Sequence, residues 1–292
     1  MPALAIYSPF QLDSNDPPAL EQLGWRFLAE GDSWFTIGSL NPAKNSNLLF
    51  ELSFGQSAGA VNCAFPGDTL RRMSQMNRDK QFANLLAGKK ARNWDAVLLS
   101  CGGNDLIDAI GVRGDGLKPA QRLLLAPAEW GPESDGPMRY VSADGWLAFA
   151  RYFQANLEQL LARRLGGPSE GCPVFMHGYA YPTPRPAGAA HGMGPWIYPS
   201  VQAYGIPEVE QPALAQLLLR RLGDLLAACA ADGSRFPNLH FFDTARIPID
   251  AAAPGSTGVS GDWVNEIHLT WRGYDKLAAP WAAHIEAALA AR

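Results

Sequence analysis

The chain alternates short apolar runs, each about as long as a β-strand, with longer segments whose apolar residues recur at helical spacing. Each short run ends in Gly, Asp or another polar residue, as expected of strands that lead into turns. This alternation is typical of βαβ units built around a parallel sheet. The five runs that we predict as strands are residues 25–29, 58–63, 96–101, 173–177 and 239–242.

The longer segments carry one apolar face each, which predicts amphipathic helices that pack against the sheet. The last of them begins at Thr270 and repeats large apolar residues every four positions, at Leu277, Trp281 and Ile285. We predict the other main helices over residues 68–86, 142–165 and 212–231.

Two segments, residues 106–140 and 178–209, interrupt this rhythm with Gly, Pro and little periodicity. Loops of this length in a compact domain usually serve binding or cover an active site. We therefore expect a single domain over residues 1–292, with both loops lining the active site. The aromatic side chains Tyr179 and Tyr181 of the second loop are candidates for contacting substrate.

The composition excludes several classes of protein. Of the 292 residues, 47% are hydrophobic and 18% are charged, which is enough apolar surface for a sizeable core and argues against disorder. The net charge is −4, with 24 basic and 28 acidic residues, and no run of five or more basic residues is present. Nucleic acid and anionic membrane surfaces are therefore not expected as partners.

The cysteines and the N-terminus bear on the cellular compartment. Cys63, Cys101, Cys172 and Cys229 form no CxxC pair and no short spacing typical of metal ligands. We interpret them as buried apolar residues in a reducing compartment. The first twenty residues lack a basic segment followed by a long apolar one, and no apolar run reaches the length of a membrane span. We expect a cytoplasmic protein, or a secreted one trimmed of its leader.

The polar residues that follow the predicted strands carry the candidate chemistry. Ser33 follows the first strand, Gly67 the second, and Asn104 the third; His268 lies in the loop before the last helix. In an open parallel sheet the carboxyl ends of the strands share one edge, so these residues are expected to converge. A serine hydroxyl needs a base such as histidine to become a nucleophile, and a tetrahedral oxyanion needs N–H donors nearby. We expect Ser33 to lie at a helix N-terminus, where its own N–H also points to the oxyanion.

These residues resemble the four sequence blocks of the SGNH (GDSL-type) hydrolases. The blocks are the Gly31-Asp32-Ser33-Trp34 segment, Gly67, the 102–105 segment Gly-Gly-Asn-Asp and His268, in the order found in that family. The resemblance implies a three-layer α/β/α, flavodoxin-like fold, for which we expect a five-stranded parallel sheet. It implies Ser33 as the nucleophile, His268 as the general base and Ser33, Gly67 and Asn104 as the oxyanion hole. No metal and no organic cofactor is implied.

The group that orients His268 is open at the level of sequence. The family often has Asp three residues before the histidine, and here that position is Asn265. A neutral amide cannot stabilise an imidazolium as a carboxylate does. We favour Asp262 reaching His268 across the loop, with Glu266 as one alternative. The other alternative is a Ser-His dyad, or a His268 ring supported by Asn265.

The leading functional hypothesis is a serine esterase that acts on a small-molecule ester through an acyl-enzyme, with Trp34, Tyr179 and Tyr181 in contact with the substrate. One alternative is acyl transfer, or carbohydrate O-deacetylation, at the same site. A binding module that has lost catalysis would be expected to lack one of Ser33, Asn104 and His268, all of which are present.

Overall fold

The computed structural model describes residues 1–292 except 39–44, 76–79, 115 and 190–191. Its centre is a six-stranded sheet in the order β1-β3-β2-β4-β5-β6, in which every neighbouring pair is parallel. The strands are β1 (Ala5–Tyr7), β2 (Trp25–Gly31), β3 (Ala58–Asn62), β4 (Ala96–Ser100), β5 (Val174–His177) and β6 (Leu239–Phe242).

The predicted α/β fold with a parallel sheet is confirmed, and the strand count is corrected from five to six. The five predicted strands correspond to β2–β6, and their order is the doubly wound, flavodoxin-like one. The additional strand, β1, has three residues and pairs only with β3 at the edge of the sheet. Three residues are too few to show a periodic pattern, which is why the sequence did not indicate this strand.

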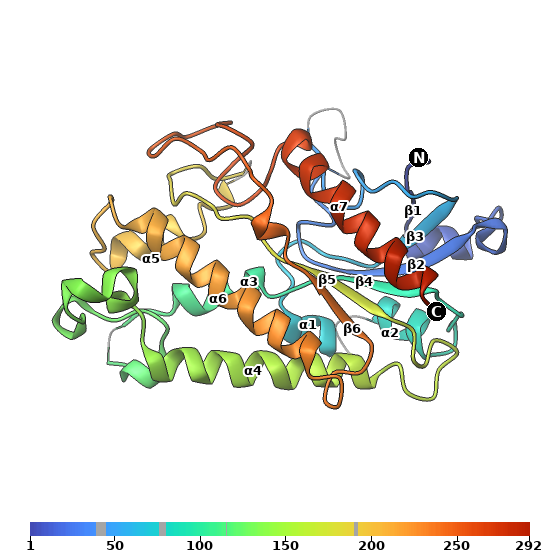
Figure 1. The fold of residues 1–292 in the computed structure, drawn as a ribbon, viewed down its shortest axis with the longest axis horizontal. Coiled ribbons are helices and arrows are strands. Elements are labelled where there is room, and N and C mark those ends of the chain that lie inside the picture. Colours follow the sequence, from blue (N-terminus) through green and yellow to red (C-terminus); the bar gives the residue numbers. More distant parts are fainter. Residues whose placement is uncertain (39–44, 76–79, 115, 190–191) are drawn as a thin grey trace.

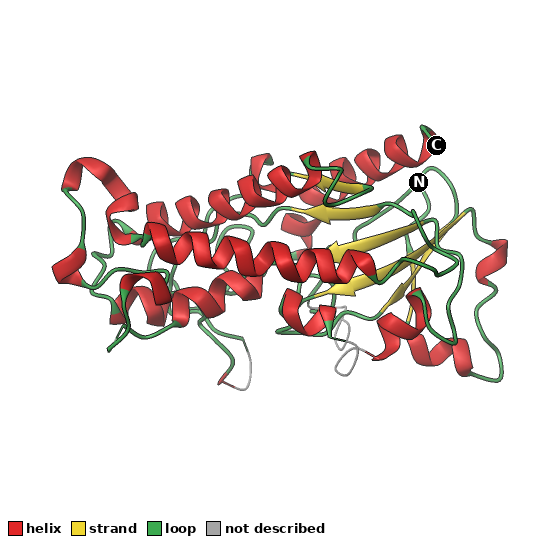
Figure 2. Cartoon of the chain, turned by 90° about the horizontal axis from the view of Figure 1, so that it is seen from below, coloured by secondary structure: helices red, strands yellow, loops and turns green. Residues whose placement is uncertain are grey.

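Helices lie on both sides of the strands, as Figure 2 shows. In Figure 1, α7 (Trp271–Ala290) passes in front of the sheet, while α1 (Leu70–Ser74) and α2 (Lys80–Leu86) lie behind it. The long helices α4 (Ala143–Ala162) and α6 (Gln211–Ala231) extend beyond the sheet, towards α3 (Gly103–Gly111) and α5 (Tyr198–Ala203). Short 3₁₀ helices occur at Pro9–Asp13, Leu20–Gln22, Pro119–Gln121, Pro127–Glu129, Glu133–Tyr140 and Thr244–Arg246.

The predicted helices at the two ends of the chain differ in outcome. The last helix begins as expected, because the Thr270 side chain accepts a hydrogen bond from the Gly273 N–H and caps α7. The single helix predicted over residues 68–86 is wrong: α1 ends at Ser74 and α2 begins at Lys80, with residues 76–79 outside the described part. The two short helices have different partners, since α1 packs mainly on α4 and α2 on β2.

The core fills the space between the sheet and its helices with apolar side chains from every layer. Cys101, Cys172 and Cys229 are buried in it as free thiols, and Cys63 is half-buried. None of the described helices is long and apolar enough to span a membrane.

Candidate active site

The turn after β2 presents Ser33 at the carboxyl edge of the sheet. β2 ends at Gly31, where a Cβ atom would lie only 2.7 Å from the Ser100 Cβ, so a glycine is needed for β2 and β4 to approach. Residues 33–38 form a single hydrogen-bonded turn, in which the Ile37 N–H donates to the Ser33 carbonyl. The predicted regular helix after Ser33 is therefore reduced to one turn among the described residues, and its dipole adds little there.

Asp32 holds this turn in place. One carboxylate oxygen accepts from the Trp34 N–H and the Ser100 hydroxyl, both at 2.9 Å, and the other accepts from the Tyr179 hydroxyl at 2.6 Å. Burial raises the pKa of Asp32 to about 6, against the lowering effect of these hydrogen bonds. Asp32 is thus a structural acceptor that fixes the conformation on both sides of Ser33.

His268 meets Ser33 from the far end of the chain. Its Nε2 atom lies 2.7 Å from the Ser33 Oγ, and both residues are buried. Burial lowers the pKa of His268 to about 3, so the ring is neutral near pH 7 and can accept a proton. The Trp196 ring packs edge-on against the imidazole, with centroids 5.3 Å apart and an interplanar angle of 86°.

Asn265 fixes the orientation of His268 and the tautomer of its ring. The Asn265 Oδ1 lies 3.0 Å from the His268 Nδ1 and accepts from the backbone N–H groups of Ile267, at 3.1 Å, and His268, at 2.9 Å. Two N–H groups can only donate, so the amide must turn its oxygen and not its NH₂ to this point. The His268 Nδ1 is then a donor, and Nε2 is left as the acceptor for the Ser33 hydroxyl.

The expected contact between Asp262 and His268 is not formed. The Asp262 carboxylate accepts instead from the Asp250 N–H at 2.8 Å and from the Lys276 ammonium. Asp262 lies at the start of the loop that leads to α7, and its backbone carbonyl accepts a hydrogen bond from the Thr270 N–H. The spacing to His268 permitted the contact, but the ion pair with Lys276 of α7 draws the side chain away. Of the three alternatives, the ring supported by Asn265 is the one that matches the geometry.

Glu266, the second alternative, is an anchor for the loop that follows β5. Its fully buried carboxylate accepts from the consecutive N–H groups of residues 196–198 and, at 3.4 Å, from the Arg185 N–H. Burial raises its pKa, and these backbone hydrogen bonds act in the opposite direction. The buried Arg185 guanidinium donates to the Asn265 carbonyl at 2.7 Å. In Figure 1 this loop (yellow) runs beside the loop before α7 (orange-red).

Replacing Glu266 with glutamine is expected to loosen this loop without removing Ser33, Asn265 or His268. The Gln NH₂ would face N–H donors, which leaves at least one buried donor unpaired at a cost of about 1–3 kcal/mol. We expect faster proteolysis within residues 185–198 and a loss of kcat, because Trp196 no longer packs firmly on His268. The matched control is Glu208→Gln at the exposed end of the same segment. Unchanged proteolysis in the Glu266 variant would contradict the anchoring role.

The sequence blocks predict three donors for an oxyanion: the backbone N–H groups of Ser33 and Gly67 and the Asn104 side-chain amide. Among the described residues, the backbone N–H groups of Ser33 and Gly67 donate to no acceptor. Gly67 has a φ of 82°, and the turn that carries it is pinned beside Ser33 by the Phe65 N–H, which donates to the Gly31 carbonyl at 3.0 Å. The Asn104 amide donates to the Asp68 carbonyl at 3.0 Å, which joins the start of α3 to this turn. The predicted roles of Gly67 and Asn104 remain predictions.

A narrow, mainly apolar cavity of about 40 Å³ opens beside Ser33. Trp34 and Tyr179 line it as expected, whereas Tyr181 is not among its lining residues. The loop after β5 contributes Ala180, Pro182 and Ile197 to the lining of the cavity. Of the other predicted loop, Leu106, Ile107 and Ile110 line the cavity as part of α3, and none of the described residues of 112–140 lines it.

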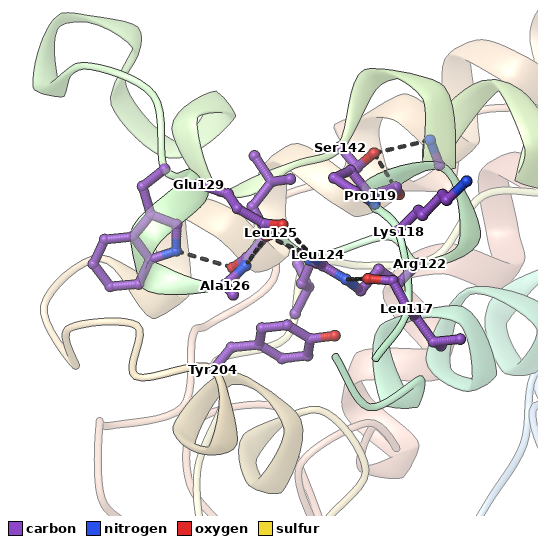
Figure 3. A network of polar contacts seen from close by, with 12 residues as sticks. Leu117, Lys118, Pro119, Arg122, Leu124, Leu125, Ala126, Glu129, Ser142 and Tyr204 are labelled. Carbon is purple, nitrogen blue, oxygen red and sulfur yellow. Dashed lines mark hydrogen bonds and ion pairs between the residues drawn. The ribbon is translucent and has the colours of Figure 1, made fainter. Parts of the chain in front are cut away.

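Residues 112–140 contribute instead to a second, larger and more polar cavity of about 720 Å³ on the other face of α3. Figure 3 shows how this loop is held: the buried Arg122 guanidinium makes two 2.6 Å contacts with Glu129 and donates to the Leu124 carbonyl.

Asp105 of α3 lines the same cavity; its Oδ2 accepts from the Leu70 N–H at 2.8 Å, and its buried Oδ1 has no partner among the described residues.

Asp105→Asn is expected to remove a pH dependence of stability. Burial raises the pKa of Asp105 to about 7, so the folded protein holds a proton that the unfolded chain releases near 3.8. Stability contributed by this proton is present below pH 3.8 and is lost as the pH rises through 7. The amide keeps the bond to Leu70 and does not titrate. Between pH 5 and pH 8 the wild type should lose roughly 2–3 kcal/mol relative to the variant in urea unfolding. Parallel pH profiles would contradict this prediction.

No protein-family model matches this sequence, and no curated protein is similar to it in sequence. Solved structures similar to this one include an extracellular lipase from Streptomyces rimosus, at 14% identity and a TM-score of 0.50, over 89% of this chain and 99% of the lipase. A second is a carbohydrate acetylesterase from Sinorhizobium meliloti, at 13% identity and a TM-score of 0.42, over 90% of this chain and 99% of the acetylesterase. A third is an aryl esterase from M. smegmatis, at 14% identity and a TM-score of 0.43, over 90% of this chain and 99% of the aryl esterase. The likeness to the lipase shows a shared α/β fold, in agreement with the fold that the four sequence blocks implied.

Proposed function

We propose that the protein is a serine ester hydrolase in which Ser33 is the nucleophile and His268 the general base. The observation that carries the proposal is the 2.7 Å contact between the Ser33 Oγ and the His268 Nε2, in a ring whose tautomer Asn265 fixes. A nucleophile, a base and a group that orients the base, each within hydrogen-bond reach, form the arrangement that activates a hydroxyl.

The reaction has two balanced halves. As the Ser33 oxygen bonds to the ester carbonyl carbon, its proton passes to the His268 Nε2; the tetrahedral intermediate then expels the alcohol, which takes that proton. Water adds to the acyl-enzyme, again losing its proton to Nε2, and the acid departs as the proton returns to the Ser33 oxygen. The N–H groups of Ser33 and Gly67 and the Asn104 amide would hold the oxyanion in both halves.

The neutral Asn265 distinguishes this site from a triad with a carboxylate. Its oxygen orients the ring and accepts from Nδ1, but it supplies no charge to the imidazolium that forms in each half-reaction. We infer that Asn265 is a positioning residue, and that the site works as a Ser-His pair with a neutral third member.

A fluorophosphonate probe tests the assignment of the nucleophile directly. We expect one covalent adduct on Ser33 in the wild type, located by peptide mass spectrometry, and none on Ser33→Ala. The matched control is Ser134→Ala, which removes an exposed serine distant from the site and should label normally. Absence of an adduct on folded wild-type protein would refute the proposal, as would an adduct on another serine.

A further inference from the structure

The cavity beside Ser33 limits what can be attached to the serine oxygen. Its volume of about 40 Å³ is far below the roughly 300–1,000 Å³ of pockets that enclose a drug-sized ligand. Apart from Asp32, Ser33 and Asn104, the lining side chains are aliphatic or aromatic. A space of this size and lining suits an acyl chain of a few carbon atoms.

The cavity lies on the acyl side of the reacting centre. The leaving alcohol takes its proton from the His268 Nε2 and must therefore depart beside that ring. His268 is not among the residues that line the cavity, whereas Ser33 and Asn104, which would face the carbonyl, both are. The part of the ester that extends away from His268 is the acyl chain.

Hydrogen bonds hold several walls of the cavity in place. The Trp34 Nε1 donates to the Ile267 carbonyl at 3.2 Å, and the Tyr179 hydroxyl donates to Asp32 at 2.6 Å. The Ile197 N–H donates to the buried Glu266 at 2.9 Å. Such walls cannot retreat without breaking buried polar contacts, so the cavity does not widen easily for a larger group.

The remaining wall is aliphatic and belongs to α3 and α6. Ile110 is fully buried and Ile107 half-buried on one face of α3, and Leu219 faces them from α6. Close packing of this kind resists insertion of even one additional methylene group at a cost of about 1–3 kcal/mol. These branched side chains determine how far an acyl chain can extend.

We propose that the acyl group accepted by Ser33 has two to four carbon atoms, so that the substrates are short-chain esters such as acetates, propanoates and butanoates. This specificity rests on the proposed hydrolase function. It excludes long-chain fatty esters as substrates, because their chain would have to displace the walls formed by Ile107, Ile110 and Leu219.

The test uses 4-nitrophenyl esters of the C2, C4, C6, C8 and C12 acids, in which the leaving group is constant and only the acyl chain changes. We expect kcat/KM to be highest for the C2 or C4 ester. It should then fall with each added methylene group, by at least tenfold in total at C8. Equal or faster hydrolysis of the C8 or C12 ester would overturn the proposal.

Two variants that shorten the wall locate the cause of the limit. Ile110→Ala and Ile107→Ala should each raise the ratio of kcat/KM for C8 to that for C2 by about tenfold. Ile107 is half-buried, so its variant keeps the proposal testable if Ile110→Ala fails to fold. The matched control is Ile6→Ala on β1, a half-buried position at the distant edge of the sheet that should leave the ratio unchanged.

The outcomes separate the two proposals. If folded wild-type protein hydrolyses none of the esters and takes no fluorophosphonate label, the hydrolase function fails and the specificity fails with it. If it is labelled and hydrolyses long esters best, only the short-chain specificity is refuted. An unchanged C8-to-C2 ratio in both Ile variants would likewise refute the role of the α3 wall.

Discussion

Replacing His268 with alanine is expected to lower kcat for ester hydrolysis roughly a thousandfold or more, with little change in KM. The Ser33 hydroxyl then has no base within reach, because its Oγ is bonded to the His268 Nε2 alone among the described titratable side chains. The substrate still contacts the same cavity, so binding in the ground state is retained. The measurement is steady-state kinetics on a 4-nitrophenyl ester, together with a thermal unfolding curve to verify the fold.

His240→Ala is the matched control for this prediction. His240 lies in β6, where its ring stacks on Phe175 with centroids 4.9 Å apart, and it makes no contact with the site. Its loss should lower stability modestly and leave kcat within about threefold. A His268 variant that retains more than a tenth of the wild-type kcat would show that another group accepts the serine proton.

Asn265→Asp is expected to raise kcat at neutral pH by roughly tenfold, the equivalent of about 1.4 kcal/mol in the activation barrier. The carboxylate would be isosteric with the amide and would accept the same N–H groups from Ile267 and His268. It would add the negative charge that stabilises the imidazolium. A kcat equal to or below that of the wild type, in a folded variant, would contradict this prediction.

Asn265→Asp should also move the acid limb of the pH profile of kcat/KM to a higher pH. The pKa of His268 is lowered by burial to about 3, so the imidazole itself stays unprotonated well below pH 6. A carboxylate on the ring raises that pKa, by roughly one to three units, and activity is then lost at a higher pH. Asp32, whose pKa is about 6, titrates in both proteins and therefore cancels from the comparison.

Asp262→Asn separates this interpretation from the sequence-based one. The amide can still accept from the Asp250 N–H, and only the ion pair with the partly exposed Lys276 is lost. We expect kcat within about threefold of the wild type, since the Asp262 carboxylate bonds to Asp250 and Lys276 and not to His268. A large loss of turnover would restore Asp262 as the group that acts on His268.

Much of the fold could be predicted from the sequence, because the information lies in local patterns. The strands β2–β6 are apolar runs that end in turn residues, and the doubly wound order follows from their alternation with helices. β1 was missed because three residues show no period. The division of residues 68–86 into two helices was also missed, since it depends on the separate packing partners of α1 and α2 and not on local spacing.

The candidate site was predictable as a set of residues but not as a set of contacts. Ser33 and His268 follow strand-end and loop patterns, and the structure brings them together. The choice among Asp262, Asn265 and Glu266 depended on partners elsewhere in the chain. Glu266 is drawn to the backbone of residues 196–198 and Asp262 to Lys276, which leaves Asn265 on the ring. No spacing rule encodes that competition.

The distance along the chain between Ser33 and His268 has a consequence for how activity is acquired. The two residues lie 235 positions apart, and a second hydrogen bond, from Trp34 to Ile267, spans 233. Joining the ends of a loop of that length opposes folding by about 5 kcal/mol of chain entropy, which only the completed sheet and α7 can offset. We therefore expect an N-terminal fragment that carries Ser33 to be inactive, and we expect turnover during renaturation to return with the last long-range contacts and not with the first helices.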